Sequence, residues 1–316
     1  MRKFKSQAIV LAIAGLSLVV SGCGQLGAIK AKMSFKDANT LYGGQDYRAA
    51  AAKYEEAVAA DPNLTAAYFF LGNSYDNLYR PARRGEAAND ALLTKAVDNY
   101  RKAASSEQDP KIRQLALEYL VSAYGPDKLN DPSQQEPLVQ EMIKLSPTEP
   151  TNYFALAKIY EDNGEYESAE TSFLKAKEVR PTEPTVYTQL AGFYNRQGNF
   201  EKTIGALQER AQREPTNPEA HHLIATYYWD KVYRDFRLPD AEKRKFIESG
   251  IQAEDKAIEL KNDYFEAITY KNLLLRLQAN VEKDPAKQQA LLKEADRLRD
   301  QAQELRKKQQ AGAAGE

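Results

Sequence analysis

The sequence predicts an all-α fold built from repeated pairs of helices. Three large ring residues, Tyr153, Tyr187 and His221, are spaced 34 positions apart, and a proline stands six positions before each of them. From Tyr153 onward the apolar residues follow the spacing i, i+3, i+4, i+7, which places them on one face of a helix. Glycine or proline interrupts each apolar run, so one helix ends there before the next begins.

The composition of the 316 residues excludes several classes of protein. The 44 basic and 45 acidic residues give a formal net charge of -1, whereas a nucleic-acid-binding protein normally carries a clear basic excess. A single cysteine excludes an intramolecular disulfide framework and a cysteine-built zinc site. With 42% hydrophobic residues, the chain has enough apolar side chains to bury a core.

Residues 1–22 have the three regions of a secretory signal. Basic side chains near the start precede an apolar run over residues 8–20, and the small residues Ser21 and Gly22 come before Cys23. The alternative is a transmembrane anchor, but a helix of this length covers roughly 20 Å of a hydrocarbon core that is roughly 30 Å thick. The run is too short to span a bilayer comfortably.

Residues 20–23, Val-Ser-Gly-Cys, resemble the lipobox of bacterial lipoproteins. The resemblance implies cleavage before Cys23 and acylation, palmitate included, of its thiol and new amine; a buried free cysteine is the alternative. Gly24 stands where an aspartate would retain such a lipoprotein at the inner membrane, so the resemblance implies the outer membrane, facing the periplasm. Residues 23–30 then form the lipidated N-terminus and a short tether.

The predicted array of helix pairs occupies residues 31–283. Its first pair covers about 31–64 and carries alanine, leucine and tyrosine at helical spacing. The second pair begins near residue 65 and contains an insertion of roughly a dozen residues around 78–94. The third, about 111–149, keeps the apolar residues of its first helix but lacks the alanine and phenylalanine of its second.

The fourth and fifth pairs carry the clearest pattern. Ala157 and Ala169 are small where two helices approach closely, and aromatic residues fill the gaps between neighbouring pairs. Gly164 suits the left-handed end of a first helix, and Pro181 ends a second helix. This pattern resembles the tetratricopeptide repeat, whose period is 34 residues. The resemblance implies a right-handed α-solenoid of about six to seven helix pairs, each of which buries its apolar face against the next.

The end of the array is less regular. A second insertion covers 231–246 in the sixth pair, and a degenerate seventh pair begins near Phe265. A charged helix over 284–308 follows, and its narrow apolar seam, 291–305, predicts a cap on the last pair; self-association through the seam is the alternative. Residues 309–316 form a predicted disordered tail. Both insertions are rich in basic residues, and we expect lengthened, locally packed helices there, with a partner or anionic lipid surface as the alternative.

The sequence contains no recognisable catalytic motif. Phosphate-binding loops, dinucleotide fingerprints, zinc-protease motifs and nucleophile elbows do not occur in it. His221 and His222 are adjacent, so on a helix they point about 100° apart and do not readily chelate one metal. We therefore expect no enzyme, cofactor or metal, and we expect His221 to take part in packing.

The resemblance to the tetratricopeptide family implies a partner-binding groove lined by first-helix residues that packing does not use. Aromatic residues in this groove would anchor a partner segment, and the single tryptophan, Trp229, is the strongest candidate; packing under the second insertion is its alternative. The basic and amide residues are scattered, which disfavours a clamp for carboxylate tails. The candidate groove residues are Phe35, Asn39, Phe69, Asn73, Phe154, Lys158, Arg196, His222, Thr226 and Trp229.

These features predict a membrane-anchored scaffold that holds protein partners in the cell envelope, with no nucleic acid among its partners. One alternative is a subunit or assembly factor of an envelope machine, such as a pilus or an outer-membrane protein assembly complex. Another is a glycan-binding envelope protein, which would stack sugars on exposed aromatic rings.

Overall fold

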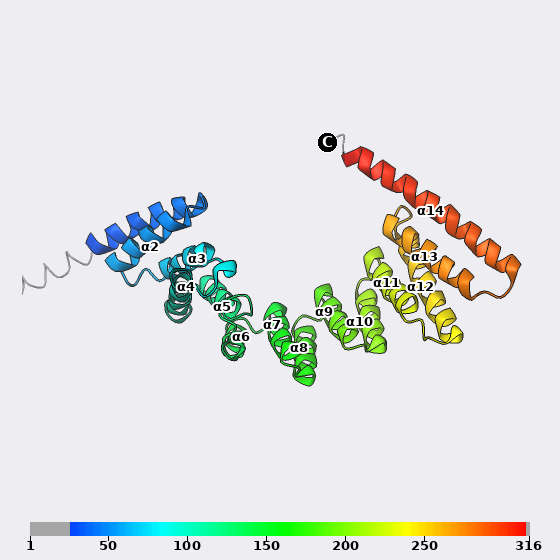
Figure 1. Ribbon diagram of the computed structural model, residues 1–316, viewed down its shortest axis with the longest axis horizontal. Helices are drawn as coiled ribbons and strands as arrows, with labels where there is room; N and C mark the ends of the chain where they lie inside the picture. Colours follow the sequence, from blue (N-terminus) through cyan, green and yellow to red (C-terminus); the bar gives the residue numbers. More distant parts are fainter. Residues whose placement is uncertain (1–25, 314–316) are drawn as a thin grey trace, which may run out of the picture. The chain divides into compact units, whose positions relative to one another are not determined.

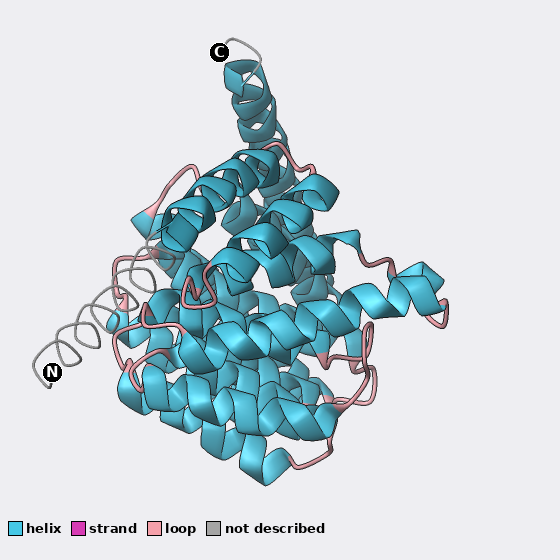
Figure 2. Ribbon diagram, turned by 90° about the vertical axis from the view of Figure 1, so that its left-hand side faces the viewer, coloured by secondary structure: helices cyan, strands magenta, loops and turns pink. Residues whose placement is uncertain are grey.

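Every regular element of residues 26–313, the part of the chain that the computed structural model describes, is a helix (Figure 1). Figure 2 shows these helices joined by loops, and the all-α prediction is confirmed. The predicted signal peptide and Cys23 lie outside the described residues. Within residues 26–313, no helix has both the length and the apolar character needed to cross a membrane.

The chain forms two units, Met1–Ala169 and Glu170–Glu316, whose boundary falls within α8 (Tyr166–Val179). In each unit a helix packs chiefly on its neighbours in the chain, as expected for an α-solenoid of helical hairpins. The first unit contains helical residues 26–43, α2 (Tyr47–Ala60), α3 (Ala66–Leu78), η1 (Pro81–Arg83), α4 (Ala87–Ser106), α5 (Pro110–Ala123), η2 (Pro132–Gln134), α6 (Gln135–Leu145) and α7 (Pro150–Asp162). The second contains α9 (Pro184–Arg196), α10 (Phe200–Arg213), α11 (Pro218–Arg234), α12 (Asp240–Leu260), α13 (Phe265–Val281) and α14 (Pro285–Ala313).

Small residues let paired helices approach closely. On α2, Ala50 and Ala57 are fully buried and lie on the same face as the buried ring of Tyr54. On α3, a Cβ atom at Gly72 would lie 2.8 Å from Cδ1 of Tyr100 on α4. The α3–α4 contact therefore requires glycine at that position.

The 34-residue period of ring residues and prolines has a direct physical cause. In each case the ring of a first helix reaches back to the backbone carbonyl of the proline that precedes that helix. These contacts join the Tyr153 hydroxyl to Pro147 at 2.8 Å, the Tyr187 hydroxyl to Pro181 at 2.7 Å, and Nε2 of His221 to Pro215 at 3.3 Å. His221 thus takes the place of a tyrosine in the same contact with a proline carbonyl.

Two predicted boundaries are wrong. Residues 26–30, assigned to the tether, are helical, and α14 continues to Ala313 although the prediction ended it at 308. Residues 309–313, which were predicted to belong to the disordered tail, are therefore part of α14. The reason is intrinsic propensity, because alanine, leucine, lysine and glutamine favour the helix even where no apolar periodicity marks it.

The apolar seam of α14 packs on its own chain. Ala295 and Leu298 are buried and form a cluster with Ile268 and Leu275 of α13. The surface that would have supported self-association through the seam is therefore already used within one chain.

Both insertions lengthen helices that pack locally. In the first, the buried amide of Asn89 donates to the carbonyls of Arg80 and Arg83, each at 3.1 Å, which ties η1 to the start of α4. In the second, α11 and α12 are both extended and the loop 235–239 joins them. The second insertion therefore builds up the end of α11, where the candidate site lies.

Candidate functional site

Three helices of the second unit, α9, α11 and α13, bring polar and aromatic side chains to one hollow of about 250 Å³. We call this hollow the groove. On α11, Thr226, Trp229 and Asp230 follow the spacing i, i+3, i+4, which places them on one side of the helix. The groove is lined by Asn195 of α9, by Thr226, Tyr227, Trp229 and Asp230 of α11, and by Tyr270 of α13.

Four rings form a continuous aromatic track along the groove: His222, Tyr270, Trp229 and Tyr233. Trp229 stacks on Tyr233 with ring centroids 4.8 Å apart and planes at 11°, and its edge meets Tyr270 at 5.4 Å. Tyr270 contacts His222 at 5.2 Å. Tyr233 is 64% exposed, so the open end of the aromatic track presents a flat apolar face to solvent.

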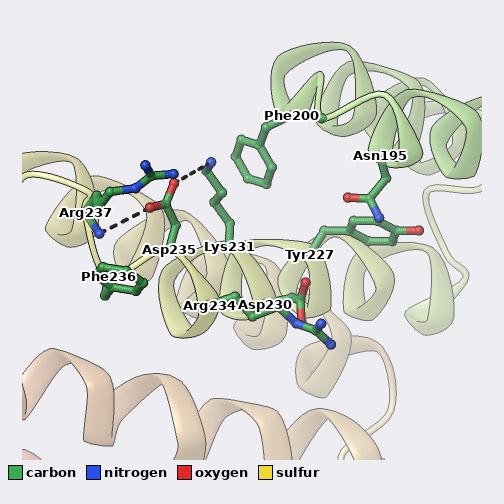
Figure 3. A pocket seen from close by; sticks show the side chains of 10 residues that line it. Asn195, Phe200, Tyr227, Asp230, Lys231, Arg234, Asp235, Phe236 and Arg237 are labelled. Atoms are coloured by element: carbon green, nitrogen blue, oxygen red, sulfur yellow. Dashed lines mark hydrogen bonds and ion pairs between the residues drawn. The ribbon is translucent and has the colours of Figure 1, made fainter.

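A second hollow adjoins the groove and shares Asn195, Tyr227 and Asp230 with it. Figure 3 shows Asn195 of α9 beside the ring of Tyr227 on α11, with the charged end of α11 farther along. Phe236, in the loop after α11, lines this hollow and is 83% exposed. A phenylalanine side chain is rarely left so exposed to solvent. Phe236 therefore enlarges the open aromatic surface.

Paired charges surround the second hollow. Nζ of Lys231 lies 3.0 Å from the carboxylate of Asp235, and this hydrogen bond holds the pKa of Asp235 below its usual value. Beside this pair on the same helix end, Arg234 pairs with Asp230, four positions before it. Since both pairs carry one charge of each sign, the site has polar contacts to offer without a strong net charge.

A buried ionisable pair lies at the inner end of the aromatic track. Nδ1 of His222 on α11 is 2.9 Å from the carboxylate of Glu254 on α12, whose side chain is fully buried. Burial raises the pKa of Glu254 to about 7, and the contact with His222 opposes that rise. This pair links the two helices of one hairpin. Within the described residues, no three histidine, cysteine or acidic side chains group as a metal would require.

Comparison with known proteins assigns one of the helix pairs. The family model described as tetratricopeptide repeat matches residues 150–183, which contain α7 and α8. The chain carries a tetratricopeptide repeat. No curated protein matches the chain.

One solved structure with a TM-score above 0.5 shows the same fold. The C-terminal part of a tetratricopeptide-repeat-containing protein from Cytophaga hutchinsonii superposes with a TM-score of 0.56 at 17% identity, over 84% of this chain and 95% of that one. MamA gives 0.46 at 16% identity, over 66% and 98%. The type IV pilus biogenesis factor PilW gives 0.41 at 19% identity, over 74% and 94%. The first of these confirms the array of helical hairpins, and likeness at such low identity shows the fold alone.

Four of the predicted groove residues belong to the second unit. Thr226 and Trp229 line the groove, and His222 lies one ring contact beneath it. Arg196 is exposed at the end of α9, and its charge acts on the ring hydroxyl of Tyr227. The tetratricopeptide pattern thus brings these four side chains to one region of one unit.

Two of the predicted groove residues are buried in the first unit, so that part of the assignment is wrong. Phe69 is 6% exposed and packs against Tyr100 of α4 at 6.0 Å and Tyr119 of α5 at 5.6 Å. The amide oxygen of Asn73 accepts a hydrogen bond from the Tyr42 hydroxyl at 2.6 Å. Large rings from neighbouring helices cover these positions, which in a regular repeat would face the groove.

The four remaining predicted residues also lie in the first unit. Phe35 is half-buried against the ring of Tyr54, whose hydroxyl donates to the exposed Asn39 at 2.7 Å. Phe154 is half-buried, and Lys158 is exposed and forms an ion pair one turn along α7. Lys158 also lines a hollow of about 500 Å³ between α7 and the end of α5. These residues do not join the groove of the second unit.

Several aromatic residues of the site were not predicted, among them Tyr227, Tyr233, Phe236 and Tyr270. Tyr233 stands four positions after Trp229, a spacing that places both on one helix face, so it could have been found. Phe236 follows the end of the regular repeat, and Tyr270 comes from a degenerate one, so no motif position singled them out.

Proposed function

We propose that this protein is a membrane-anchored tetratricopeptide scaffold that binds a partner protein in the groove of its second unit. The single observation that carries the proposal is the aromatic track, which ends in the exposed stack of Trp229 on Tyr233. Buried or half-buried aromatic anchors beside polar groups are typical of protein interfaces. Tetratricopeptide repeats, supported here by the family match and the fold, commonly provide such surfaces.

The lining of the groove favours a particular kind of partner segment. Apolar or aromatic side chains of the partner would stack on Trp229 and Tyr233. Asn195 and Thr226 supply a side-chain amide and a hydroxyl for the partner's backbone. Because nearby charges are paired, we expect an affinity that depends weakly on salt.

Anchoring at the outer membrane belongs to the same proposal and rests on the sequence. The lipobox at residues 20–23 favours acylation of Cys23, and Gly24 favours the outer membrane. Two or more acyl chains, at about 0.8 kcal/mol per buried CH₂, hold a protein stably at a bilayer. Labelling with an alkyne analogue of palmitate tests this part, since a Cys23→Ala variant should incorporate none.

Site-specific photo-crosslinking tests the groove. A photoreactive amino acid at position 233 should crosslink to a partner protein in cells, and the crosslink should be lost when Trp229→Ala is added. The matched control places the same photoreactive group at position 166, where Tyr166 is also exposed but lies outside the groove. Equal crosslinking from both positions, or a crosslink that survives Trp229→Ala, would refute the groove as the binding site.

The flat exposed stack of Trp229 on Tyr233 also supports a second candidate, glycan binding, because sugar rings pack on such faces. Titration with envelope polysaccharide separates the two. Saturable quenching of the fluorescence of Trp229, the single tryptophan, would favour the glycan, and an unchanged spectrum would leave the protein partner.

A further inference from the structure

The helix at residues 26–43 carries large apolar side chains on the side that faces solvent. Leu26, Ile29 and Met33 are 70%, 58% and 64% exposed, and their spacing of three and four positions aligns them on one face. We call these three residues the apolar stripe. No other stretch of eight residues within 26–310 exposes three large apolar side chains. The apolar stripe is therefore a distinct feature of this end of the chain.

The opposite face of the same helix is fixed by packing on α2. Ala31 and Ala38 are fully buried, and Phe35 contacts Tyr54 of α2 with ring centroids 5.7 Å apart. A Cβ atom at Gly27 would lie 2.9 Å from the carbonyl oxygen of Ala60, so the first turn is also held close to α2 (Figure 1). The apolar stripe is thus held in place facing away from the first unit, which leaves more than half of each of its side chains exposed.

Charged residues surround the apolar stripe in the pattern of a helix at a membrane surface. Lys30 lies on one side of the stripe and Lys32 and Lys36 lie on the other, and all three are exposed. Lysines in such positions extend toward phospholipid headgroups while apolar neighbours enter the acyl boundary.

The apolar stripe is confined to one end of the helix. After Met33 the same face continues with the polar residues Asp37 and Thr40. The apolar stripe is about 10 Å long, since a helix rises 1.5 Å per residue. The change from apolar to polar along one face fits a helix of which only the first two turns enter the interface.

We propose that the apolar stripe seats this end of the helix in the interface of a bilayer that contains anionic phospholipid. The proposal rests on the proposed acylation of Cys23, which precedes Leu26 by three positions. Three extended residues reach about 10 Å, so an acylated Cys23 keeps the apolar stripe beside the membrane. Since acyl chains at one residue leave a protein free to rotate, this second contact would orient the first unit at the bilayer.

A second copy of the chain fits the apolar stripe less well. Three partly exposed side chains offer on the order of 300 Å², whereas a stable interface buries about 800 Å² on each partner. The flanking lysines would also face each other across a symmetric contact and repel.

Vesicle binding by the unacylated chain tests the proposal. Residues 23–316 with Cys23→Ser keep every described residue and lack both the acyl acceptor and the apolar run of the signal. Flotation would compare vesicles of phosphatidylethanolamine and phosphatidylglycerol with vesicles of phosphatidylcholine alone. The stripe variant carries Leu26→Gln, Ile29→Gln and Met33→Gln. Its control carries Leu115→Gln, Leu174→Gln and Leu292→Gln, which also alter exposed leucines.

We expect the chain to bind the anionic vesicles, and the stripe variant to bind at least about tenfold more weakly. Lys30→Gln should weaken binding about fivefold, with less effect on phosphatidylcholine, and the control should match the parent chain. Circular dichroism melting checks that each variant is folded.

The proposal is overturned if the unacylated chain does not bind vesicles, or if the stripe variant binds as well as the parent. It is also overturned if sedimentation shows a dimer that the stripe variant dissociates while vesicle binding is absent. These outcomes leave the palmitate-labelling test of Cys23 untouched, so a failure of the apolar stripe is distinguishable from a failure of the anchor.

Discussion

The buried Glu254 should make the stability of the second unit depend on pH in an unusual direction. Its pKa is raised from the ordinary value of 4.5 to about 7 because the side chain is fully buried, with the charge of Asp255 adding to the rise. The folded state therefore holds the proton more tightly than the unfolded state does. The resulting stabilisation is fully present below pH 4.5 and is lost as pH rises through 7.

The size of this effect follows from the difference in pKa. A difference of 7 minus 4.5, at about 1.4 kcal/mol per unit, corresponds to about 3.5 kcal/mol in total, most of which is lost between pH 4.5 and pH 8. Glu254→Gln keeps the shape and a hydrogen-bonding group opposite His222 but removes the titration. We therefore expect the substitution to stabilise the second unit at pH 8 and to have little effect at pH 5.

Trp229 provides the assay, because this single tryptophan contacts Tyr270, which in turn contacts His222. Urea unfolding followed by tryptophan fluorescence at pH 5 and pH 8 gives the free energy of unfolding of this region. Glu248→Gln is the matched control, since Glu248 lies on the same helix and is exposed. If Glu254→Gln and Glu248→Gln show the same change in stability between the two pH values, the reasoning about burial is refuted.

Three further predictions concern the stability of individual helix contacts. Gly72→Ala places a methyl group against the ring of Tyr100. Because overpacking outweighs the gain in helix propensity, we expect thermal melts to show a net loss of stability of roughly 1 kcal/mol. An unchanged melting temperature would contradict this prediction. Lys128→Met leaves Asp76, which is 8% exposed, without its ion-pair partner, and should lower the free energy of unfolding in urea by roughly 3 kcal/mol. If this penalty is electrostatic, adding Asp76→Asn should restore part of the loss. Leu298→Ala should cost roughly 2–5 kcal/mol and speed hydrogen exchange in α14, and unaltered exchange there would argue against the packing of α14 on α13.

Local regularities of the sequence were sufficient to predict the helices and their pairing. The ring residues and prolines recur because a ring in three successive first helices bonds to the proline carbonyl only six positions earlier, as Tyr187 does with Pro181. Small residues such as Ala157 and Ala169 recur because closely packed helices leave no room for larger ones. Contacts between residues so close in the chain can be predicted from the residue spacing within one repeat.

The candidate site could be predicted only in part. Thr226 and Trp229 were found because the repeat pattern stays regular up to the second insertion. Phe69 and Asn73 were assigned to a groove although rings from other helices bury them. The repeat rule describes a regular array, and it fails where a neighbouring pair is irregular in length or carries an unusually large side chain.

The sequence by itself therefore determined the all-α class, the helix pairs and the face of α11 that lines the groove, because each depends on residues within one or two turns of one another. The tertiary structure decided which of those faces remain open. It placed Tyr270 against Trp229 and buried Glu254 beside His222, contacts that join residues 41 and 32 positions apart. It also left the apolar stripe uncovered. Burial depends on what packs above a residue, and at these positions that neighbour comes from a distant, irregular part of the chain.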